Sequence, residues 1–284
     1  MLDKTFLRSS DPILTARNLI NSIYKVSFPI DVEQIALNVG IQEINKVSDE
    51  NVEGFLVALP DKSAGFINIS RQIKENSRIR FTIAHELGHF LITTHNESSY
   101  SCSVSDMKNR KNSKPQEVEA NKFAAELLMP QKFFVSELKK EPDCMLFENL
   151  AFKFGASLQA TLIRYSEFTD ESIAVVLSEN SMVKWCSKSK SFNFEIGTKM
   201  PLSEETYAKD FFDGHELSKI FEDVDINAWF DTINIKHKIK VKELCFPSPE
   251  YNQALSVIWV IEDEDEIEAS EDEFDGYLKL KKSW

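Results

Sequence analysis

Residues 80–90 contain the pattern His-Glu-x-x-His, in the form His85-Glu86-Leu87-Gly88-His89. On an α-helix, residues four apart share a face, so the two imidazoles point the same way and can bind one divalent metal ion. Glu86 follows the first histidine and can reach the open side of the metal as a general base. The pattern therefore requires a helix here and predicts a metal-dependent hydrolytic site.

The surrounding residues indicate that this helix is buried. Apolar residues recur through the segment at helical spacing, and further apolar residues widen the apolar face. Two imidazoles and a carboxylate in a buried helix need polar partners, because burial without them is unfavourable. We therefore favour a metal site over two ordinary hydrogen-bonded histidines. The apolar positions are Ile79, Phe81, Ile83, Ala84, Leu87, Phe90 and Leu91.

Composition limits the class of protein. The chain has 284 residues, of which 42% are hydrophobic and 28% charged, and this excludes a wholly disordered chain. The net charge of −13 argues against nucleic acid as a direct partner, because nucleic-acid binders carry a basic face. No apolar run reaches membrane-spanning length, the N-terminal segment mixes charged with apolar residues, and the four cysteines form no C-x-x-C pair. We expect a cytoplasmic protein with reduced thiols and no membrane partner.

Periodicity and turn residues predict an α+β fold. We expect the His-Glu-x-x-His helix to begin near Asn76 or Ser77 and to follow a β-hairpin. Ser113 and Gln116 fit a capping box for the next helix, which comes after a polar loop. The predicted helices span residues 11–24, 29–40, 117–129, 131–140, 147–154 and 158–168, the predicted strands 41–47, 54–59 and 66–69, and the loop 96–114.

The pattern changes after Asp170, where strand-like runs dominate. We place a helical domain with a small sheet at residues 1–168 and a mostly β domain of unknown role at residues 169–284. The acidic stretch 262–275 is interpreted as a solvated segment without an assigned function. The strand-like runs are 173–177, 182–185, 239–246 and 251–261.

A catalytic zinc usually takes a third protein ligand. His95 has the spacing of the metzincin pattern, but that pattern needs a glycine where this chain has Ile92, so we do not favour His95. A carboxylate on the helix at 117–129 is the better candidate, because small alanines let the helix approach closely. Glu117 is the first choice, and Asn121 on the same face would bond a ligand imidazole. Glu119 and Glu126 are the alternatives.

Two motifs in this order, residues 80–89 and 117–130, resemble the ImmA/IrrE family of metallo-endopeptidases. The resemblance covers roughly residues 10–168. It implies a gluzincin-like zinc peptidase with a zincin-like fold, of bacteria, their phages or mobile elements. It also implies His85 and His89 as ligands, Glu86 as the base and a glutamate of the second helix as third ligand, for which we choose Glu117. Known members cleave a helix-turn-helix repressor, so the expected partner is a repressor protein.

We therefore expect an endopeptidase that uses zinc or another divalent metal ion. Tyr100 and His95 are candidates for a second oxyanion donor. One alternative is a metal-stabilised regulator that binds a protein without cleaving it. Another is DNA binding through a helix-turn-helix rhythm at residues 150–164, but that segment carries only Lys153 and Arg164 as cations.

Overall fold

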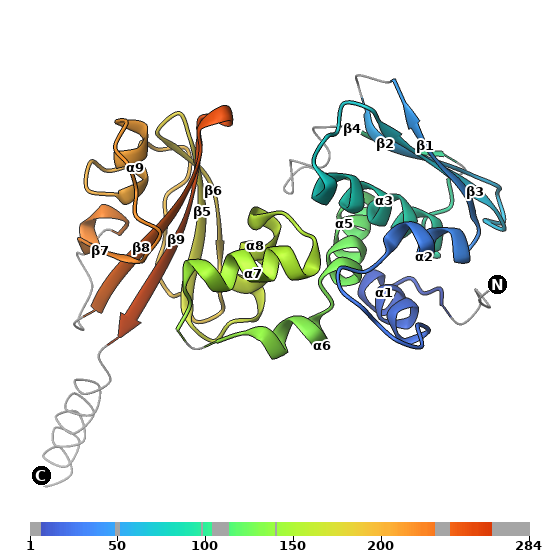
Figure 1. Cartoon of the computed structure of the whole chain (residues 1–284), viewed down its shortest axis with the longest axis horizontal. Coiled ribbons are helices and arrows are strands. Elements are labelled where there is room, and N and C mark those ends of the chain that lie inside the picture. The colour runs from blue at the N-terminus through green and yellow to red at the C-terminus, as the bar shows by residue number, and fades with distance from the viewer. Residues whose placement is uncertain are drawn as a thin grey trace, which may run out of the picture. The chain divides into compact units, whose positions relative to one another are not determined.

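The computed structural model describes residues 7–48, 52–97, 99–103, 114–139, 141–230 and 239–262 (Figure 1). The chain divides into two compact units. The N-terminal unit comprises Met1–Glu137 and Glu148–Thr161, and the C-terminal unit comprises Leu138–Phe147 and Leu162–Trp284. The predicted boundary between residues 168 and 169 stays a prediction.

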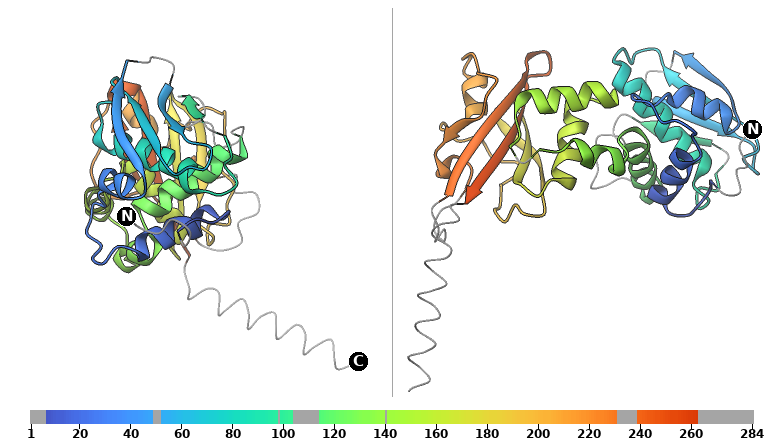
Figure 2. Two further views of the ribbon diagram at one scale, coloured as in Figure 1. Left: turned by 90° about the vertical axis from the view of Figure 1, so that its right-hand side faces the viewer. Right: turned by 60° about the horizontal axis from the view of Figure 1, so that its bottom comes forward.

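The N-terminal unit places helices on one face of a small sheet (Figures 1 and 2). The strand order is β1-β3-β2-β4, with β1 parallel to β3 and the other pairs antiparallel. Helix α3 packs on β2 and β3, α5 packs on α3, and α1 packs on α5. The elements are α1 (Pro12–Asn21), α2 (Val32–Asn38), β1 (Ile41–Val47), β2 (Val52–Ala58), β3 (Gly65–Ser70), α3 (Asn76–Leu91), β4 (Ser99–Ser103), α5 (Pro115–Leu128), α6 (Gln131–Phe134) and the 3-10 turn η1 (Val135–Glu137).

The alternation of buried and exposed side chains along β2 and β3 determines which face of the sheet α3 covers. Leu56 and Ile67 are paired across the strands and fully buried, whereas the next pair, Val57 and Phe66, is 44% and 43% exposed. Successive side chains of a strand point to opposite faces, so one face joins the core and the other meets solvent. The His-Glu-x-x-His helix is therefore held against a rigid hairpin.

The C-terminal unit is an antiparallel sheet with the order β6-β5-β9-β8-β7. Phe147, Tyr165 and Phe246 form edge-to-face ring contacts with centroids 5.0 and 6.4 Å apart. The elements are α7 (Cys144–Phe154) and α8 (Leu158–Phe168), both of which cross the division between the units, then β5 (Ser172–Glu179), β6 (Met182–Lys188), α9 (Tyr207–Phe212), β7 (Glu222–Val224), η2 (Ile226–Ala228), β8 (Ile239–Ser248), η4 (Pro249–Tyr251) and β9 (Gln253–Glu262).

One charged side chain, Glu243 of β8, is fully buried in this unit. Its carboxylate accepts hydrogen bonds from the backbone N–H groups of Tyr207 and Ala208, from Trp229 Nε1 and from Ser256 Oγ, at 2.7–2.9 Å. Burial raises the pKa of this carboxyl, against the lowering effect of the four hydrogen bonds. Glu243 therefore connects α9 and the segment of Trp229 to the sheet.

The α+β fold and the elements that surround the motif are confirmed. Helix α3 begins at Asn76, and α8 spans the predicted residues, with Ser157 Oγ accepting from the Ala160 N–H. Within the part of the chain that the structure describes, no helix has the length and apolar character needed to cross a membrane.

Several predicted bounds were wrong. Helix α2 begins at Val32, capped by Asp31, rather than at Pro29. The N-cap of α5 is Lys114, and the predicted cap Ser113 lies outside the described residues. The predicted helix at 131–140 is two short turns, and the predicted loop at 96–114 contains β4. The acidic stretch 262–275 lies outside the described residues beyond Glu262.

Candidate metal centre

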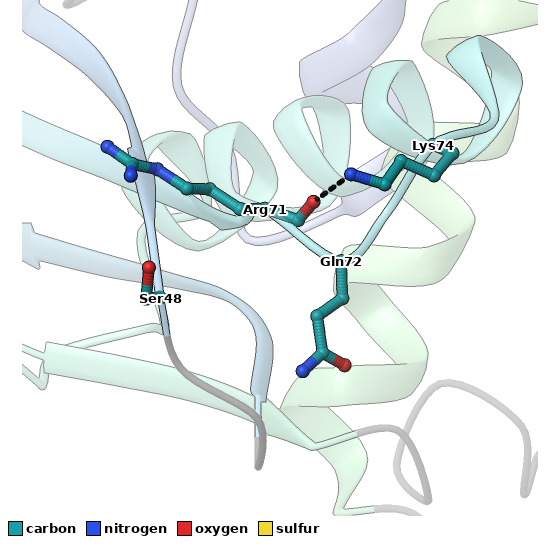
Figure 3. A pocket seen from close by; sticks show the side chains of 4 residues that line it. All are labelled: Ser48, Arg71, Gln72 and Lys74. Carbon is teal, nitrogen blue, oxygen red and sulfur yellow. Dashed lines mark hydrogen bonds between the residues drawn. The ribbon is translucent and has the colours of Figure 1, made fainter.

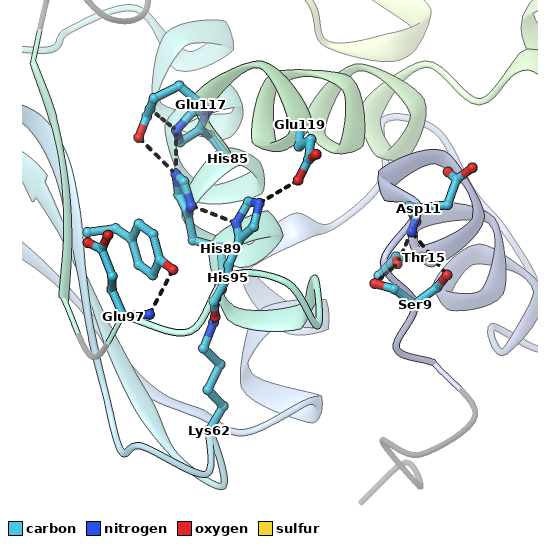
Figure 4. A network of polar contacts seen from close by, with 11 residues as sticks. Ser9, Asp11, Thr15, Lys62, His85, His89, His95, Glu97, Glu117 and Glu119 are labelled. Carbon is cyan, nitrogen blue, oxygen red and sulfur yellow. Dashed lines mark hydrogen bonds and ion pairs between the residues drawn. The ribbon is translucent and has the colours of Figure 1, made fainter. Parts of the chain in front are cut away.

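Two buried imidazoles of α3 face a carboxylate of α5 (Figure 4). His85 Nε2 and His89 Nε2 are 3.1 Å apart, Glu117 Oε2 is 3.1 Å from His85 Nε2, and Glu117 Oε1 is 3.5 Å from His89 Nε2. Both histidines are fully buried, and Glu117 is 6% exposed. One ligand atom from each residue lies within 4.8 Å of the others, so the three side chains could hold one metal ion.

The chemistry of the donor set fits a zinc ion. Two imidazole nitrogens and one carboxylate oxygen are a ligand set of catalytic zinc sites. His85 Nδ1 lies 2.9 Å from Asn121 Oδ1, an oxygen that only accepts, so Nδ1 carries the hydrogen of this bond. This is the support that the sequence predicted for Asn121, because an acceptor on one ring nitrogen orients the other toward a metal.

The pKa values of His85, His89 and Glu117 are set by burial and by the contacts among these side chains and Glu86. Burial lowers the pKa of His89 to about 4, against the raising effect of Glu117. Burial would also lower the pKa of His85, but its hydrogen bond to Glu117 and the charge of Glu86 outweigh burial and raise it. Burial would raise the pKa of Glu117, but its hydrogen bonds to the two histidines outweigh this and lower it. Glu117 is therefore held in its ionised form, the form that can bind a metal ion.

Glu86 is fully buried next to Gly54 of β2. A Cβ atom on Gly54 would lie 2.4 Å from Thr82 Cγ2 and 3.3 Å from Glu86 Oε1. Only a glycine leaves this space, because the inner face of the strand passes close to the helix. The sequence analysis missed Gly54, whose only signal was its position in a strand, where glycine often marks a close approach.

The other carboxylates of α5 have different partners. Glu119 Oε2 lies 3.0 Å from His95 Nε2, so Glu119 does not face the imidazole pair of α3. Glu126, the second alternative ligand, accepts from Arg17 of α1 at 2.9 Å. Of the three glutamates weighed as third ligand, only Glu117 joins the metal group.

His95 and Tyr100 both contact His89. His95 Nδ1 lies 2.9 Å from His89 Nδ1, and the Tyr100 ring stacks on the His89 ring with centroids 4.2 Å apart. The Tyr100 hydroxyl accepts from the Glu97 N–H, and burial raises the pKa of this phenol. Both candidates for an oxyanion donor therefore already have partners beside the metal group.

Lys62, in the turn between β2 and β3, is a further residue that the sequence analysis missed. It is 7% exposed, and its Nζ donates to the backbone carbonyls of His89 and His95. Burial, together with the charge of the nearby Arg8, lowers the pKa of its ammonium to about 8. A lysine among turn residues gives no signal of such burial in a sequence.

A surface hollow of about 450 Å³ is lined by Ser48, Arg71, Gln72 and Lys74 (Figure 3). Lys74 Nζ donates to the Arg71 carbonyl at 3.0 Å. None of these residues belongs to the group of His85, His89 and Glu117. The hollow and the metal group therefore share no residue.

The two cations of the helix-turn-helix-like segment have intramolecular partners. Lys153 pairs with Glu137 at 2.7 Å, and Arg164 pairs with Glu167 at 3.0 Å with 8% of its side chain exposed. Leu150, Phe154 and Leu162 of this segment are buried. Packing therefore accounts for this segment.

An α+β unit with two imidazoles and a glutamate on one helix, and a carboxylate from the next, has the parts of a metallopeptidase centre. Residues 40–166 match the peptidase M78 family model, described as the IrrE N-terminal-like domain. The match supports the predicted resemblance of this part of the chain to the ImmA/IrrE family. The match includes the three donors and Glu86. No curated protein matches the chain.

Proposed function

We propose that the chain is a zinc-dependent endopeptidase with a zincin-like centre, in which His85, His89 and Glu117 are the metal ligands. The observation that carries this proposal is the convergence of three donor atoms within 4.8 Å inside a peptidase-family match. Three protein ligands leave one coordination position for water or substrate, whereas structural zinc sites use four. The ligand number therefore favours an enzyme over a metal-stabilised binding protein.

Each side chain of the centre has a distinct task in this proposal. A zinc ion held there would supply a Lewis acid and lower the pKa of a water molecule. Glu86, the neighbour of His85 in sequence, accepts the proton of the attacking water and later donates it to the leaving amine. Gly54 leaves space for this carboxylate, and Asn121 holds the ring of His85.

The proposed substrate is a helix-turn-helix repressor, and the proposed consequence of cleavage is gene activation. This part of the proposal rests on the ImmA/IrrE family and on the peptidase-family match. The net charge of −13 supports a protein substrate rather than DNA as the direct partner, because nucleic acid would be repelled.

The central prediction concerns Glu86→Gln. The amide retains the volume of the side chain but cannot accept the water proton, so we expect cleavage to fall by about 10²–10⁴-fold while zinc binding stays stoichiometric. The measurement expresses the chain in bacterial cells and identifies new N-termini by mass spectrometry across the proteome, those of helix-turn-helix repressors included. Zinc content is measured on the purified proteins.

Glu126→Gln is the matched control, because Glu126 is a buried carboxylate of the same unit that pairs with Arg17 instead of joining the metal group. This variant should generate the same new N-termini as the wild type. Full cleavage by the Glu86→Gln variant would remove Glu86 from the mechanism. If cells with the zinc-loaded wild type give no N-termini beyond those of cells without the chain, the binding alternative is favoured.

A further inference from the structure

His89 is joined to a second pair of side chains on the side of its ring that faces away from Glu117 (Figure 4). Its Nδ1 lies 2.9 Å from His95 Nδ1, and His95 Nε2 lies 3.0 Å from Glu119 Oε2. His95 is 1% exposed, and the Glu119 side chain is 34% exposed. The contacts therefore run from a buried candidate ligand through a buried histidine to a carboxylate at the surface.

A neutral His95 beside an ionised Glu119 leaves one consistent arrangement of donors and acceptors in these contacts. An ionised carboxylate only accepts, so His95 Nε2 must donate to Glu119. A neutral imidazole has one N–H, which leaves His95 Nδ1 as an acceptor for the Nδ1–H of His89. The lone pair of His89 is then on Nε2, the atom that lies 3.1 Å from His85 Nε2 in the metal group.

The backbone around His95 is held in place by the buried Lys62 and the half-buried Arg8. Lys62 Nζ donates to the carbonyls of both His89 and His95, and so ties the segment after α3 to the helix end. Arg8 donates to the carbonyls of Lys62 and Phe90, each at 3.1 Å. Since α3 ends at Leu91, these bonds return His95 to the level of His89.

We propose that His95 and Glu119 are positioning residues that set the tautomer and ring orientation of His89. This inference rests on the proposed function, because it takes His89 as a metal ligand. His95 is not itself a ligand, since both its ring nitrogens are engaged with His89 and Glu119. The two candidate ligands are thus supported differently: His85 by the neutral amide of Asn121, His89 by a histidine–carboxylate pair.

The test measures the zinc affinity of the full chain by competition with a chromophoric chelator at fixed pH. His95→Leu and Glu119→Leu should each weaken zinc binding by about 10–100-fold, the usual effect of removing the partner of a ligand. His95→Gln should recover most of the affinity, because its amide can accept from His89 and donate to Glu119. The exposed Lys122→Leu, on the same helix, should bind zinc as the wild type does.

Kinetics and spectroscopy separate positioning from general stability. With a cleaved repressor as substrate, the leucine variants at saturating zinc should lower kcat with little change in KM. NMR of the zinc-loaded wild type should show His95 protonated at Nε2, which needs no variant to fold. A His95 protonated only at Nδ1, or unchanged zinc affinity in a folded His95→Leu variant, would overturn the inference while leaving the proposed function intact. A wild type that binds no zinc would overturn both.

Discussion

Gly54 shows how one missing side chain decides the position of Glu86, the proposed catalytic base. The residue is buried on the inner face of β2, where a Cβ atom would overlap Thr82 Cγ2. The same Cβ would contact Glu86 Oε1 at 3.3 Å. Because interiors are close-packed, the space left by this glycine is what admits the carboxylate of the proposed base.

We predict that Gly54→Ala lowers the free energy of unfolding by about 1–3 kcal/mol and reduces peptidase activity. The added methyl group forces α3 away from the strand and moves Glu86. The measurement is chemical denaturation together with cleavage of the repressor. Thr82→Ser removes the methyl group that the added Cβ atom would strike, so the double variant should regain most of the lost stability. A single variant as stable and active as the wild type would contradict this view of Gly54.

The three glutamates of α5 have tasks that their sequence positions only partly indicate. Glu117 shares a helical face with Asn121, and both contact the imidazoles of α3, as predicted from their spacing. Glu119 was an alternative third ligand, but it contacts His95 instead, which reaches it from a segment after α3. Helical spacing fixes the direction of a side chain but not what another segment brings to meet it.

At the scale of elements, the close approach of α3 and α5 sets the distance between imidazoles and carboxylate. Gly88 lies at this crossing, where a Cβ atom would lie 3.1 Å from Phe123 Cδ1 and 3.3 Å from Ala120 Cα. The sequence analysis expected small alanines to permit the approach, and Ala120 does so. Gly88, a variable position of the motif, supplies the other half of the contact.

We predict that Gly88→Val weakens zinc binding at least about 10-fold and lowers the free energy of unfolding by about 1–3 kcal/mol. The branched side chain pushes α5, and with it Glu117, away from the histidines. Gly88→Ala is the milder control. Its single methyl group still makes tight contacts, but alanine favours the helix over glycine by about 1 kcal/mol. The measurements are zinc competition and denaturation. Wild-type zinc affinity in a folded Gly88→Val variant would show that the crossing does not control the centre.

At the scale of the whole molecule, each unit has its own core. The N-terminal core surrounds α3, and the C-terminal core lies on the face of the sheet that carries Val241 and Cys245 of β8. Glu243 lies between these two residues in sequence and connects the covering segments to that face through four hydrogen bonds. The four hydrogen bonds of Glu243 therefore all lie within the C-terminal unit.

We predict that Glu243→Ala lowers the free energy of unfolding of the C-terminal unit by about 3 kcal/mol, because it leaves three buried donors and one half-buried donor without their acceptor. Zinc affinity should not change, since the three proposed ligands all lie in the N-terminal unit. Ser256→Ala removes only one donor and should cost about 1 kcal/mol. Calorimetry and zinc competition check both. A Glu243→Ala variant that loses zinc affinity would contradict the separation of the two cores.

The sequence by itself determined the local features of this protein. The i, i+4 spacing of the two histidines, the apolar repeat of their helix and the hairpin before it are properties of neighbouring residues, so periodicity predicts them. The choice of Glu117 followed from the same kind of spacing. The elements without strong periodicity, such as β4 and the short turns after Pro130, were predicted wrongly because their form depends on what they pair with.

Only the tertiary structure decided which distant groups meet the motif. Gly54 and Lys62 precede His85 by more than twenty residues, and nothing in their spacing marks them as neighbours of Glu86 or His95. The pairing of His95 with Glu119 likewise joins a segment after α3 to the next helix. Such contacts depend on how strands and helices pack rather than on the order of residues along one element.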